Sequence, residues 1–316
     1  MFELSVIVPV YNDSKHISVC LESLLNQSGV NIKIIIVNDC STDDTYKIVT
    51  NYADENSNIQ VINMPTNSGP GLARNTGIKY VDTPYIAFID SDDWVDLNFY
   101  KNLLDEMRKY NCEIAIAGIS DEYNNSMSSS FRYCYDDFST IDGNTALKLM
   151  TKSHNLGLFI TPIMNNKVYK TEFIVQNNIY CSDNKSWQDD FFSFFAILYA
   201  KKICLVPKVQ YHYCQNNMSI THNLNNAKFK IDNCIDVLIK IRERLYAERL
   251  YNIYEIEYNS FVERCISSLL AMLKREPLSS QTDNLIYLFE QIIKNFDSKK
   301  IIQYLDNERI YNFFNL

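Results

Sequence analysis

Tyr85-Ile-Ala-Phe-Ile-Asp90-Ser-Asp92-Asp93 is a run of five mostly apolar residues that ends in three carboxylates. A short apolar run of this kind, preceded by Pro84, predicts a buried strand. Because side chains alternate along an extended backbone, Asp90 and Asp92 project to the same side. Two adjacent carboxylates repel each other unless a cation lies between them, and oxygen ligands at a strand end suit Mg²⁺ or Mn²⁺. An isolated Asp-x-Asp is more often part of a polar turn than of a metal site, so the choice between these two interpretations depends on the neighbouring segments.

The composition is that of a globular protein with room for one large domain or two. The chain has 316 residues, of which 47% are hydrophobic, and its formal net charge of −8 predicts no general attraction to nucleic acid. The nine cysteines include no Cys-x-x-Cys pair, which favours free thiols in a reducing cytoplasm. The start of the chain lacks a basic region, and the longest apolar run, residues 191–200, is too short for a membrane span. We therefore expect no signal peptide or transmembrane helix, and peripheral attachment to a membrane stays open.

Residues 1–120 alternate between apolar runs typical of strands and patterns typical of amphipathic helices. The expected strands are Leu4–Val8, Lys33–Val37, Gln60–Asn63, Tyr85–Ile89 and Glu113–Ala117. The expected helices are Lys15–Asn26, Asp43–Tyr52, Pro70–Tyr80 and Leu97–Tyr110. This order predicts an α/β fold with a Rossmann-like, mostly parallel sheet flanked by helices. Ligands of such sheets bind beyond the carboxyl ends of the strands, where polar residues follow four of these strands.

The remainder of the chain changes character near residue 223. Before that point we expect a loop at residues 121–130, a strand at 131–135, helices near 142–152, 170–177 and 189–200, and extended segments at 203–206 and 209–213. After it, apolar residues recur at three- and four-residue steps, as in amphipathic helices. The sequence thus predicts a sheet domain over residues 1–222 and a helical domain over residues 223–316. A contact between subunits through these helices is the less favoured use of their apolar faces.

Seven segments, in this order and spacing, resemble glycosyltransferase family 2, whose members have the GT-A fold. They begin at Ser5 (SVIVPVYN), Ile36 (IVNDCSTDDT), Asn67 (NSGPGLARNTG), Ile89 (IDSDD), Asn166 (NKVYK), Trp187 (WQDDFF) and Ser219 (SIT). The resemblance covers about residues 4–221 and no part of the helical tail. It implies an inverting enzyme that uses a nucleotide-sugar donor and a divalent metal.

The resemblance assigns a nucleotide site to the polar residues at the strand ends. It implies that Asp39 accepts a hydrogen bond from N3–H of uracil, with an N-cap of the following helix as the structural alternative. Pro9, Tyr11 and Asn12 would border the base, although Pro9 could instead simply end the first strand. The other residues assigned to the donor are Gly71, Arg74, Asn75, Asp90 and Ser91. For Arg74, a surface position is the alternative.

The resemblance also assigns the metal and the base. Asp92 would bind the metal directly and Asp90 would contact the ribose or the metal, while Asp93 would either support these two or face the sugar. His212 is a further candidate ligand, although a lone histidine in a strand is more often structural. The Asp189–Asp190 segment matches the acidic pair that supplies the base. We expect Asp190 to be the base and Asp189 to orient the acceptor or serve as a backup; acids at a helix N-terminus are the structural alternative.

Three further positions in the matching segments have open roles. Trp187 is a candidate platform for a sugar ring, with core packing as the alternative. Lys167 lies near the acceptor or the diphosphate, or on the surface. Cys214 stands where many relatives carry an arginine, which puts phosphate contact by the segment that follows it in doubt.

Together these features predict an inverting glycosyltransferase, a hexosyl- or N-acetylhexosaminyltransferase that requires Mn²⁺ or Mg²⁺. It would move a sugar from a UDP-sugar to a hydroxyl of a growing glycan or lipid-linked saccharide. The resemblance suggests capsule, lipopolysaccharide or other surface-polysaccharide synthesis in the cytoplasm or at the inner face of the membrane. A nucleotidyltransferase is one alternative, although the segment after the first strand lacks a glycine-rich phosphate loop. A non-catalytic sugar-binding or scaffold module is the other, and the retained Asp90, Asp92 and Asp190 argue against it.

Overall fold

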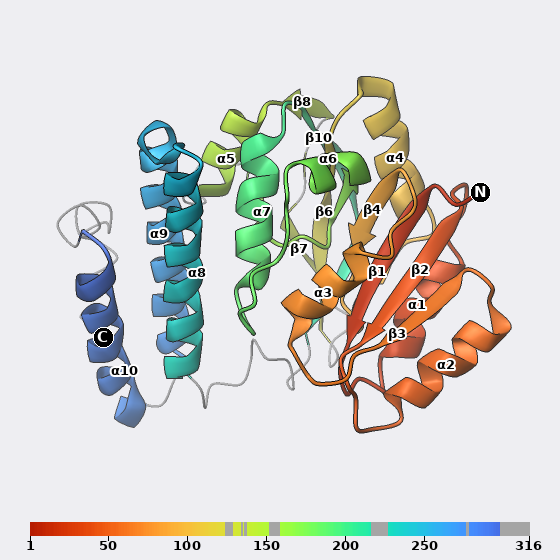
Figure 1. Cartoon of the computed structure of the whole chain (residues 1–316), viewed down its shortest axis with the longest axis horizontal. Coiled ribbons are helices and arrows are strands. Elements are labelled where there is room, and N and C mark those ends of the chain that lie inside the picture. Colours follow the sequence, from red (N-terminus) through yellow and green to blue (C-terminus); the bar gives the residue numbers. More distant parts are fainter. Residues whose placement is uncertain are drawn as a thin grey trace. The chain divides into compact units, whose positions relative to one another are not determined.

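The computed structural model describes residues 1–123, 129–133, 135, 138–151, 159–215, 227–275 and 278–297 (Figure 1). The chain divides into two compact units. The first unit comprises Met1–Ala146 and Pro162–Asn216, and the second comprises Leu147–Thr161 and Asn217–Leu316. The expected segment at residues 219–221, and residues 124–128 of the expected loop at residues 121–130, lie outside the described residues.

The first unit is built on the parallel sheet that the sequence predicts. Its first four strands are β1 (Leu4–Val10), β2 (Ile32–Asn38), β3 (Ile59–Asn63) and β4 (Tyr85–Phe88). They lie in the order β3-β2-β1-β4, and β1 pairs in parallel with both β2 and β4. The connecting helices are α1 (Ile17–Leu25), α2 (Thr45–Glu55) and α3 (Pro70–Ile78). All four strands therefore end at the same edge, and the polar segments that follow them meet there.

The far half of the sheet is mixed, and here the sequence analysis missed three strands. β9 (Lys167–Lys170) runs antiparallel between β4 and β6 (Ile114–Tyr123). β10 (Ile203–Gln215) pairs in parallel with β6 and continues through both extended segments expected there, with register shifts between Val206 and Tyr211. The other missed strands, β5 (Trp94–Val95) and β8 (Ser139–Ile141), pair antiparallel with β10, and β7 (Ser129–Tyr133) pairs with β6. The remaining helices of this part are α4 (Phe99–Tyr110), α5 (Gly143–Thr151), α6 (Thr171–Gln176) and α7 (Gln188–Tyr199).

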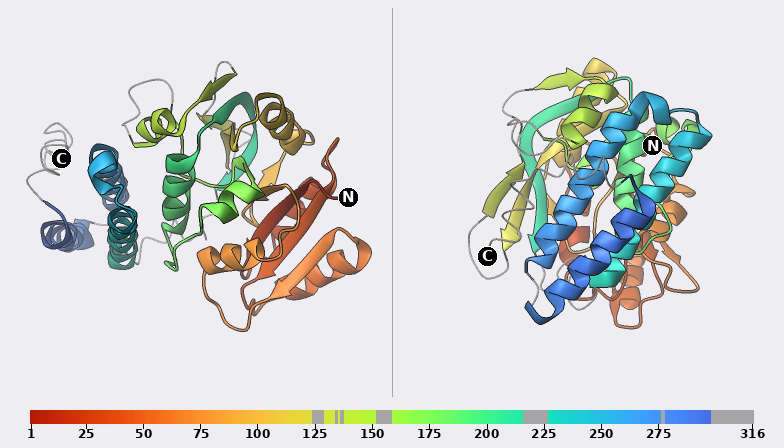
Figure 2. Two further views of the ribbon diagram at one scale, coloured as in Figure 1. Left: turned by 45° about the horizontal axis from the view of Figure 1, so that its top comes forward. Right: turned by 90° about the vertical axis from the view of Figure 1, so that its left-hand side faces the viewer.

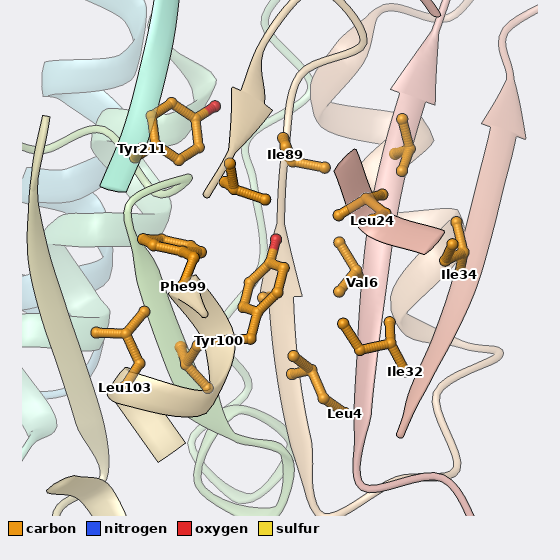
Figure 3. Packing of buried hydrophobic residues seen from close by; sticks show 14 of the residues in the cluster. Leu4, Val6, Leu24, Ile32, Ile34, Ile89, Phe99, Tyr100, Leu103 and Tyr211 are labelled. Carbon is orange, nitrogen blue, oxygen red and sulfur yellow. The ribbon is translucent and has the colours of Figure 1, made fainter. Parts of the chain in front are cut away.

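One face of the sheet carries the main hydrophobic core (Figure 3). Leu4 and Val6 of β1 pack with Leu24 of α1 and with Phe99 and Leu103 of α4 in this core. Alternate residues of β1 point to the other face, where α3 lies so close that a Cβ on Gly77 would be 2.6 Å from a methyl group of Ile7. Both faces are covered, so β1 is buried along its whole length, as expected for a central parallel strand. These observations confirm the predicted fold class.

The second unit contains three long helices, α8 (Ala227–Ala247), α9 (Tyr251–Leu273) and α10 (Leu278–Asn295). Figure 2 shows α8 and α9 side by side. The predicted apolar stripes of α8 and α9 are buried, and Tyr258 of α9 donates a hydrogen bond to the carbonyl oxygen of Leu238 at 3.0 Å. None of the helices in the described ranges combines the length and the apolar character needed to cross a membrane.

Candidate active site

The loops that follow β1 and β2 are joined by hydrogen bonds. Asn12, which has a left-handed backbone with φ of 49°, accepts the backbone N–H of Thr42 at 2.7 Å on its Oδ1. The backbone N–H of Asp13 donates to Oγ1 of Thr45 at 2.8 Å. Tyr11 remains 46% exposed, so its ring is accessible to a ligand. The two loops are therefore held together at the edge of the sheet, and they leave the ring of Tyr11 accessible.

Pro9 lies inside β1 and does not end it, so the alternative considered for this residue is wrong. The carbonyl oxygen of Ile7 accepts the N–H of Ile89 at 3.1 Å, and Pro9, two residues on, faces the same side. β4 has already ended at Phe88, so no neighbouring strand needs the N–H that proline lacks. β1 can thus continue to Val10 and carry Tyr11 beyond the sheet edge.

Asp39 organises the loop that leads into α3. Its two carboxylate oxygens accept the backbone N–H groups of Ser68 at 2.8 Å and Gly69 at 2.7 Å. Gly69 has φ of 90°, a conformation that glycine adopts without steric cost. Asp39 does not cap the helix that follows it, because α2 begins after Asp44; the N-cap alternative is therefore wrong. Each carboxylate oxygen can accept a second hydrogen bond, so a ligand can still be bound here.

Arg74 and Asp90 form an ion pair at the end of β4. Nη2 of Arg74 lies 2.5 Å from Oδ1 of Asp90, and the arginine side chain is only 4% exposed. The surface alternative for Arg74 is therefore wrong. Burial lowers the pKa of this guanidinium, but the groups around it, Asp90 foremost, together outweigh burial and raise the pKa of Arg74. Among the described residues, its Nε and Nη1 have no hydrogen-bond partner, so a buried cation with unused donors faces this region.

Several carboxylates gather around the Asp-x-Asp segment. The pKa of the Cys20 thiol on α1 is raised by burial and then by the charges of Asp93, Asp92, Asp90 and Asp13, which lie around it. Asp13 also accepts a hydrogen bond from Oγ of Ser91 at 2.6 Å. This local excess of negative charge is the setting in which a divalent cation binds. In the described part of the chain, no three His, Cys, Asp or Glu side chains form a ready-made metal site.

Asp93 and His212 connect the Asp-x-Asp segment to the far half of the sheet. Asp93 is buried and accepts hydrogen bonds from the Tyr211 hydroxyl and from the backbone N–H of Cys214, the latter at 2.9 Å. The ring of His212 stacks on Trp94 with centroids 3.5 Å apart. Its Nδ1 is 2.8 Å from Glu122 and its Nε2 is 3.0 Å from Asp96. The metal-ligand role of His212 stays a prediction. To bind a metal, one ring nitrogen would have to give up its contact with Glu122 or Asp96.

The acidic pair lies in the first turn of α7, as predicted. Asp189 is half-buried, whereas Asp190 is only 6% exposed. Burial raises the pKa of Asp189, the charge of Arg74 acts in the opposite direction, and the charge of Asp90 adds to the rise. Asp189 therefore lies within electrostatic reach of the Arg74–Asp90 pair.

Close packing of α3 against the segment before α7 brings these parts together. A Cβ on Gly71 would lie 2.5 Å from the carbonyl oxygen of Ser182 and 2.8 Å from Cγ of Gln188, so only glycine fits there. Asn75, one turn further along α3, uses both ends of its amide on Cys181: it donates to the carbonyl oxygen at 2.8 Å and accepts the N–H at 2.9 Å. In this structure Asn75 holds the 181–188 segment, and its expected contact with the nucleotide stays a prediction.

Lys167 and Trp187 complete the set of expected residues. Lys167 is fully buried, so a surface position is wrong for it. Trp187 is half-buried and has φ of 64°, and its carbonyl oxygen accepts the N–H of Asp190 at 3.1 Å. The contributions of Asp13 and Tyr211 were missed. The polar segment after the first strand signalled Asp13, whereas nothing in the sequence linked Tyr211 to Asp93, more than a hundred residues away.

Comparison with known proteins identifies the family. Residues 5–170 match the family described as glycosyl transferase family 2, and the chain belongs to this family. It is 32% identical over 238 residues to EpsH of Bacillus subtilis, which is described as a putative glycosyltransferase; the match covers 72% of this chain and 65% of EpsH. It is 28% identical over 217 residues to the poly(ribitol-phosphate) beta-N-acetylglucosaminyltransferase TarS of Staphylococcus aureus, covering 67% of this chain and 35% of TarS. The chain thus spans less than two thirds of the length of these relatives.

Solved structures share the fold. The crystal structure of S. aureus TarS 1-349 in complex with UDP-GlcNAc matches with a TM-score of 0.60 and 19% identity, over 96% of this chain and 91% of that one. The mannosyltransferase PcManGT from Pyrobaculum calidifontis in complex with GDP-Man and Mn²⁺ matches with a TM-score of 0.55 and 12% identity, over 98% and 85% of the two chains. At these identities the matches establish the fold.

Proposed function

We propose that this chain is an inverting glycosyltransferase that moves a sugar from a nucleotide-sugar donor to an acceptor hydroxyl. One observation carries the proposal: a half-buried carboxylate, Asp189, lies in electrostatic reach of the Arg74–Asp90 pair at the carboxyl end of β4. The donor would lie along the ends of β1 to β4, where sheets of this type bind ligands. Family membership favours sugar transfer over nucleotidyl transfer and over a scaffold role.

The donor is proposed to be a UDP-sugar. Asp39 is buried beside the open Tyr11 border, and its oxygens retain lone pairs that can accept N3–H of uracil. The backbone bonds from Ser68 and Gly69 hold this carboxylate in place before any ligand arrives. The structural relative TarS, which was crystallised in complex with UDP-GlcNAc, supports this donor class.

The residues present fit a divalent cation, Mn²⁺ or Mg²⁺. Asp92 would be its direct protein ligand, as the family resemblance implies, and Asp90 beside it is held by Arg74. One or two carboxylates completed by donor phosphates form a usual site for such a metal. A cation bound there would neutralise charge that develops on the departing diphosphate. The mannosyltransferase PcManGT, whose structure was solved in complex with GDP-Man and Mn²⁺, is consistent with this assignment.

We assign the base to Asp189, which revises the order expected from the sequence. In the proposed step the acceptor oxygen bonds to the anomeric carbon while the bond from that carbon to the diphosphate oxygen breaks. The hydroxyl proton passes to the carboxylate of Asp189. Burial raises the pKa of Asp189 above that of an ordinary carboxyl group, which improves its capacity to take a proton. The more deeply buried Asp190 would hold the first turn of α7 in place.

The acceptor is proposed to be a hydroxyl of a growing surface glycan or a lipid-linked saccharide, as in capsule or lipopolysaccharide synthesis. The relatives support this class by their names, which include enzymes that act on poly(ribitol-phosphate). Nucleotide-sugar chemistry would place the reaction in the cytoplasm, with peripheral binding at the inner face of the membrane as its proposed extension.

Apolar side chains exposed on α9 and α10, among them Ile256 and Ile293, would serve a homo-oligomer contact.

Two measurements test the proposal. UDP with Mn²⁺ should raise the melting temperature, because a ligand at a hundred times its Kd stabilises by about 2.7 kcal/mol. A screen of sugar nucleotides for slow donor hydrolysis, which needs no acceptor, should then single out one or a few UDP-sugars. Absence of any stabilisation by UDP, GDP or other nucleoside diphosphates, with no hydrolysis of any donor, would contradict the proposed function.

A further inference from the structure

A hydrogen bond joins the segment after β1 to the middle of the Asp-x-Asp segment, and the reaction proposed above gives this bond no role. Oγ of Ser91 donates to Oδ2 of Asp13 at 2.6 Å, across 78 positions of the sequence. A hydroxyl that donates to a carboxylate makes a short bond, roughly twice as strong as one between neutral groups. Ser91 stands between Asp90 and Asp92, so this bond acts on the backbone that carries the proposed metal ligand.

Asp13 is itself held in place from two helices. Its Oδ1 lies 2.5 Å from Nδ1 of His16, the residue before α1. Its backbone N–H donates to Oγ1 of Thr45, the first residue of α2, at 2.8 Å. The side chain of Asp13 is 15% exposed. The acceptor for Ser91 is therefore a mostly buried carboxylate with a fixed position.

Capping of α1 does not explain the carboxylate of Asp13. An aspartate at a helix start typically accepts the first N–H groups on a side-chain oxygen. Here the backbone carbonyl of Asp13 accepts the N–H groups of His16 at 3.3 Å and Ile17 at 3.2 Å. Both carboxylate oxygens are turned to other side chains, one to His16 and the other to Ser91. The carboxylate thus joins the start of α1 to the Asp-x-Asp segment.

Other hydrogen bonds hold the same turn on either side of Asp92. Sγ of Cys20 in α1 donates to the carbonyl oxygen of Asp90 at 3.6 Å. The N–H of Asp93 donates to that same oxygen at 3.1 Å. Together with the bond from Ser91, these contacts order the turn before any ligand arrives. A metal ligand on an ordered backbone loses less conformational entropy when the cation binds.

We propose that Asp13 is a positioning residue for the metal ligand: acting through the hydroxyl of Ser91, its carboxylate fixes the turn that presents Asp92 to the divalent cation. This inference rests on the metal role of Asp92 in the proposed function. Outer residues that orient a ligand typically change metal affinity by about 10–100-fold when they are replaced. Loss of the bond between Asp13 and Ser91 should therefore weaken cation binding in a chain that still folds.

The first test measures the Kd of Mn²⁺ at saturating UDP, from the electron paramagnetic resonance signal of free Mn²⁺. Ser91→Ala removes the donor and Asp13→Ala removes the acceptor, and each should raise the Kd by about tenfold. The double variant should exceed either single variant by no more than about twofold, because both changes remove the same interaction. Ser91→Thr keeps the hydroxyl and should retain most of the affinity.

Glu22 and Tyr52 provide the matched control. The Tyr52 hydroxyl donates to Oε1 of Glu22 at 2.9 Å, a bond of the same kind between α1 and α2. Glu22→Ala and Tyr52→Phe should leave the Kd of Mn²⁺ within about twofold of the wild type. An equal loss in these controls would show a general effect of α1 and would overturn the proposal. So would a wild-type Kd in Ser91→Ala, since Asp13 would then act without the serine.

The second test needs neither metal nor activity. In the metal-free full chain, the N–H of Asp93 should exchange with solvent roughly tenfold faster in Ser91→Ala than in the wild type, because the turn opens more easily. Unchanged exchange would overturn the inference. A wild type that binds no Mn²⁺ in the presence of UDP would contradict the metal role in the proposed function as well. Tight Mn²⁺ binding by both the wild type and Ser91→Ala would leave that role standing and refute only the inference.

Discussion

The two sides of the candidate site are built from different interactions. The donor side comprises residues 9–13, 38–45 and 66–71. The transfer side comprises residues 74, 90–93, 167 and 189–190. On the donor side, loops are joined by hydrogen bonds such as those from Ser68 and Gly69 to Asp39. On the transfer side, partly buried charges act on one another, as in the pairing of Arg74 with Asp90. Hydrogen-bonded loops fix the shape of a binding site, whereas buried charges set the protonation state of the groups near them. We therefore expect substitutions on the donor side to alter ligand binding and substitutions on the transfer side to alter the reaction rate.

The largest effect should come from the transfer side. Asp189→Asn removes the proposed base with little change in volume, and kcat should fall by about 10²–10⁴-fold, the usual contribution of a general base. Binding of UDP, measured by calorimetry, should change by less than about twofold, because the nucleotide is proposed to lie on the donor side. The rate of the wild type should rise with pH through the pKa of Asp189, which burial places above that of an ordinary carboxyl group.

Asp190→Asn is the matched comparison within the same turn of α7. Because Asp190 is only 6% exposed, its substitution should lower the melting temperature more than it lowers kcat in the folded fraction. If Asp190→Asn abolishes transfer in a fully folded protein while Asp189→Asn retains it, the base is Asp190 and the role assigned to Asp189 is wrong.

Metal removal should distinguish effects on binding from effects on rate less clearly than the Asp189 substitution does. Chelation should lower transfer by at least about 10²-fold, since charge on the departing diphosphate would no longer be neutralised. Asp92→Asn should weaken activation by Mn²⁺ in a titration of rate against metal concentration. Asp44→Asn, an exposed acid at the start of α2, is the control and should leave the metal dependence unchanged. Full activity of the chelated protein would refute the metal role of Asp92.

On the donor side, Asp39→Asn should weaken UDP binding by about 10–100-fold. The amide has only one oxygen, so it cannot accept the N–H group of Ser68 on one side and that of Gly69 on the other. The N3–H of uracil also loses a charged acceptor. Asp43→Asn removes a loop acceptor of the same kind, which bonds the backbone of Ser14 and Thr45, and should change affinity by less than about threefold. Calorimetric titration with UDP provides both values. Equal losses in the two variants would mean that Asp39 acts only through loop structure.

The sequence was sufficient for the parallel half of the fold and for the gathering of polar residues at its carboxyl edge. Those strands are short apolar runs, and each is followed by polar residues that the topology brings to one edge. The transfer side depends on contacts between distant segments, and the sequence does not encode these locally. Lys167 gave no sign of being buried, because β9 enters the sheet antiparallel between β4 and β6. The choice between Asp189 and Asp190 depends on how α7 is rotated against α3, which tertiary packing decides.

Gly71 lies where the two sides meet, and Gly71→Ala should destabilise the protein by about 1–3 kcal/mol. The added Cβ would lie 2.5 Å from the carbonyl oxygen of Ser182, and backbone atoms yield little to such overpacking. Urea denaturation measures the loss. Gly29→Ala is the control, because its added Cβ would meet only the flexible side chain of Lys101, although its φ of 70° also carries some strain. An unchanged stability for Gly71→Ala would show that α3 and the 182–188 segment are less tightly packed than described.

The smallest effect is expected at Cys40, on the donor side. This residue has φ of 62°, a left-handed conformation that costs a residue with a Cβ about 1–2 kcal/mol. Glycine relieves this strain but has a more flexible unfolded state, which costs about 0.5–1 kcal/mol. Cys40→Gly should therefore gain at most about 1 kcal/mol in urea denaturation and leave UDP affinity unchanged. Asn12, also left-handed with φ of 49°, provides the contrast: its Oδ1 accepts the N–H of Thr42, so Asn12→Gly should lose stability. The Sγ of Cys40 lies 3.8 Å from the carbonyl oxygen of Pro65. A clear loss of stability in Cys40→Gly would mean that the Cys40 side chain stabilises the folded protein by more than its backbone strain destabilises it.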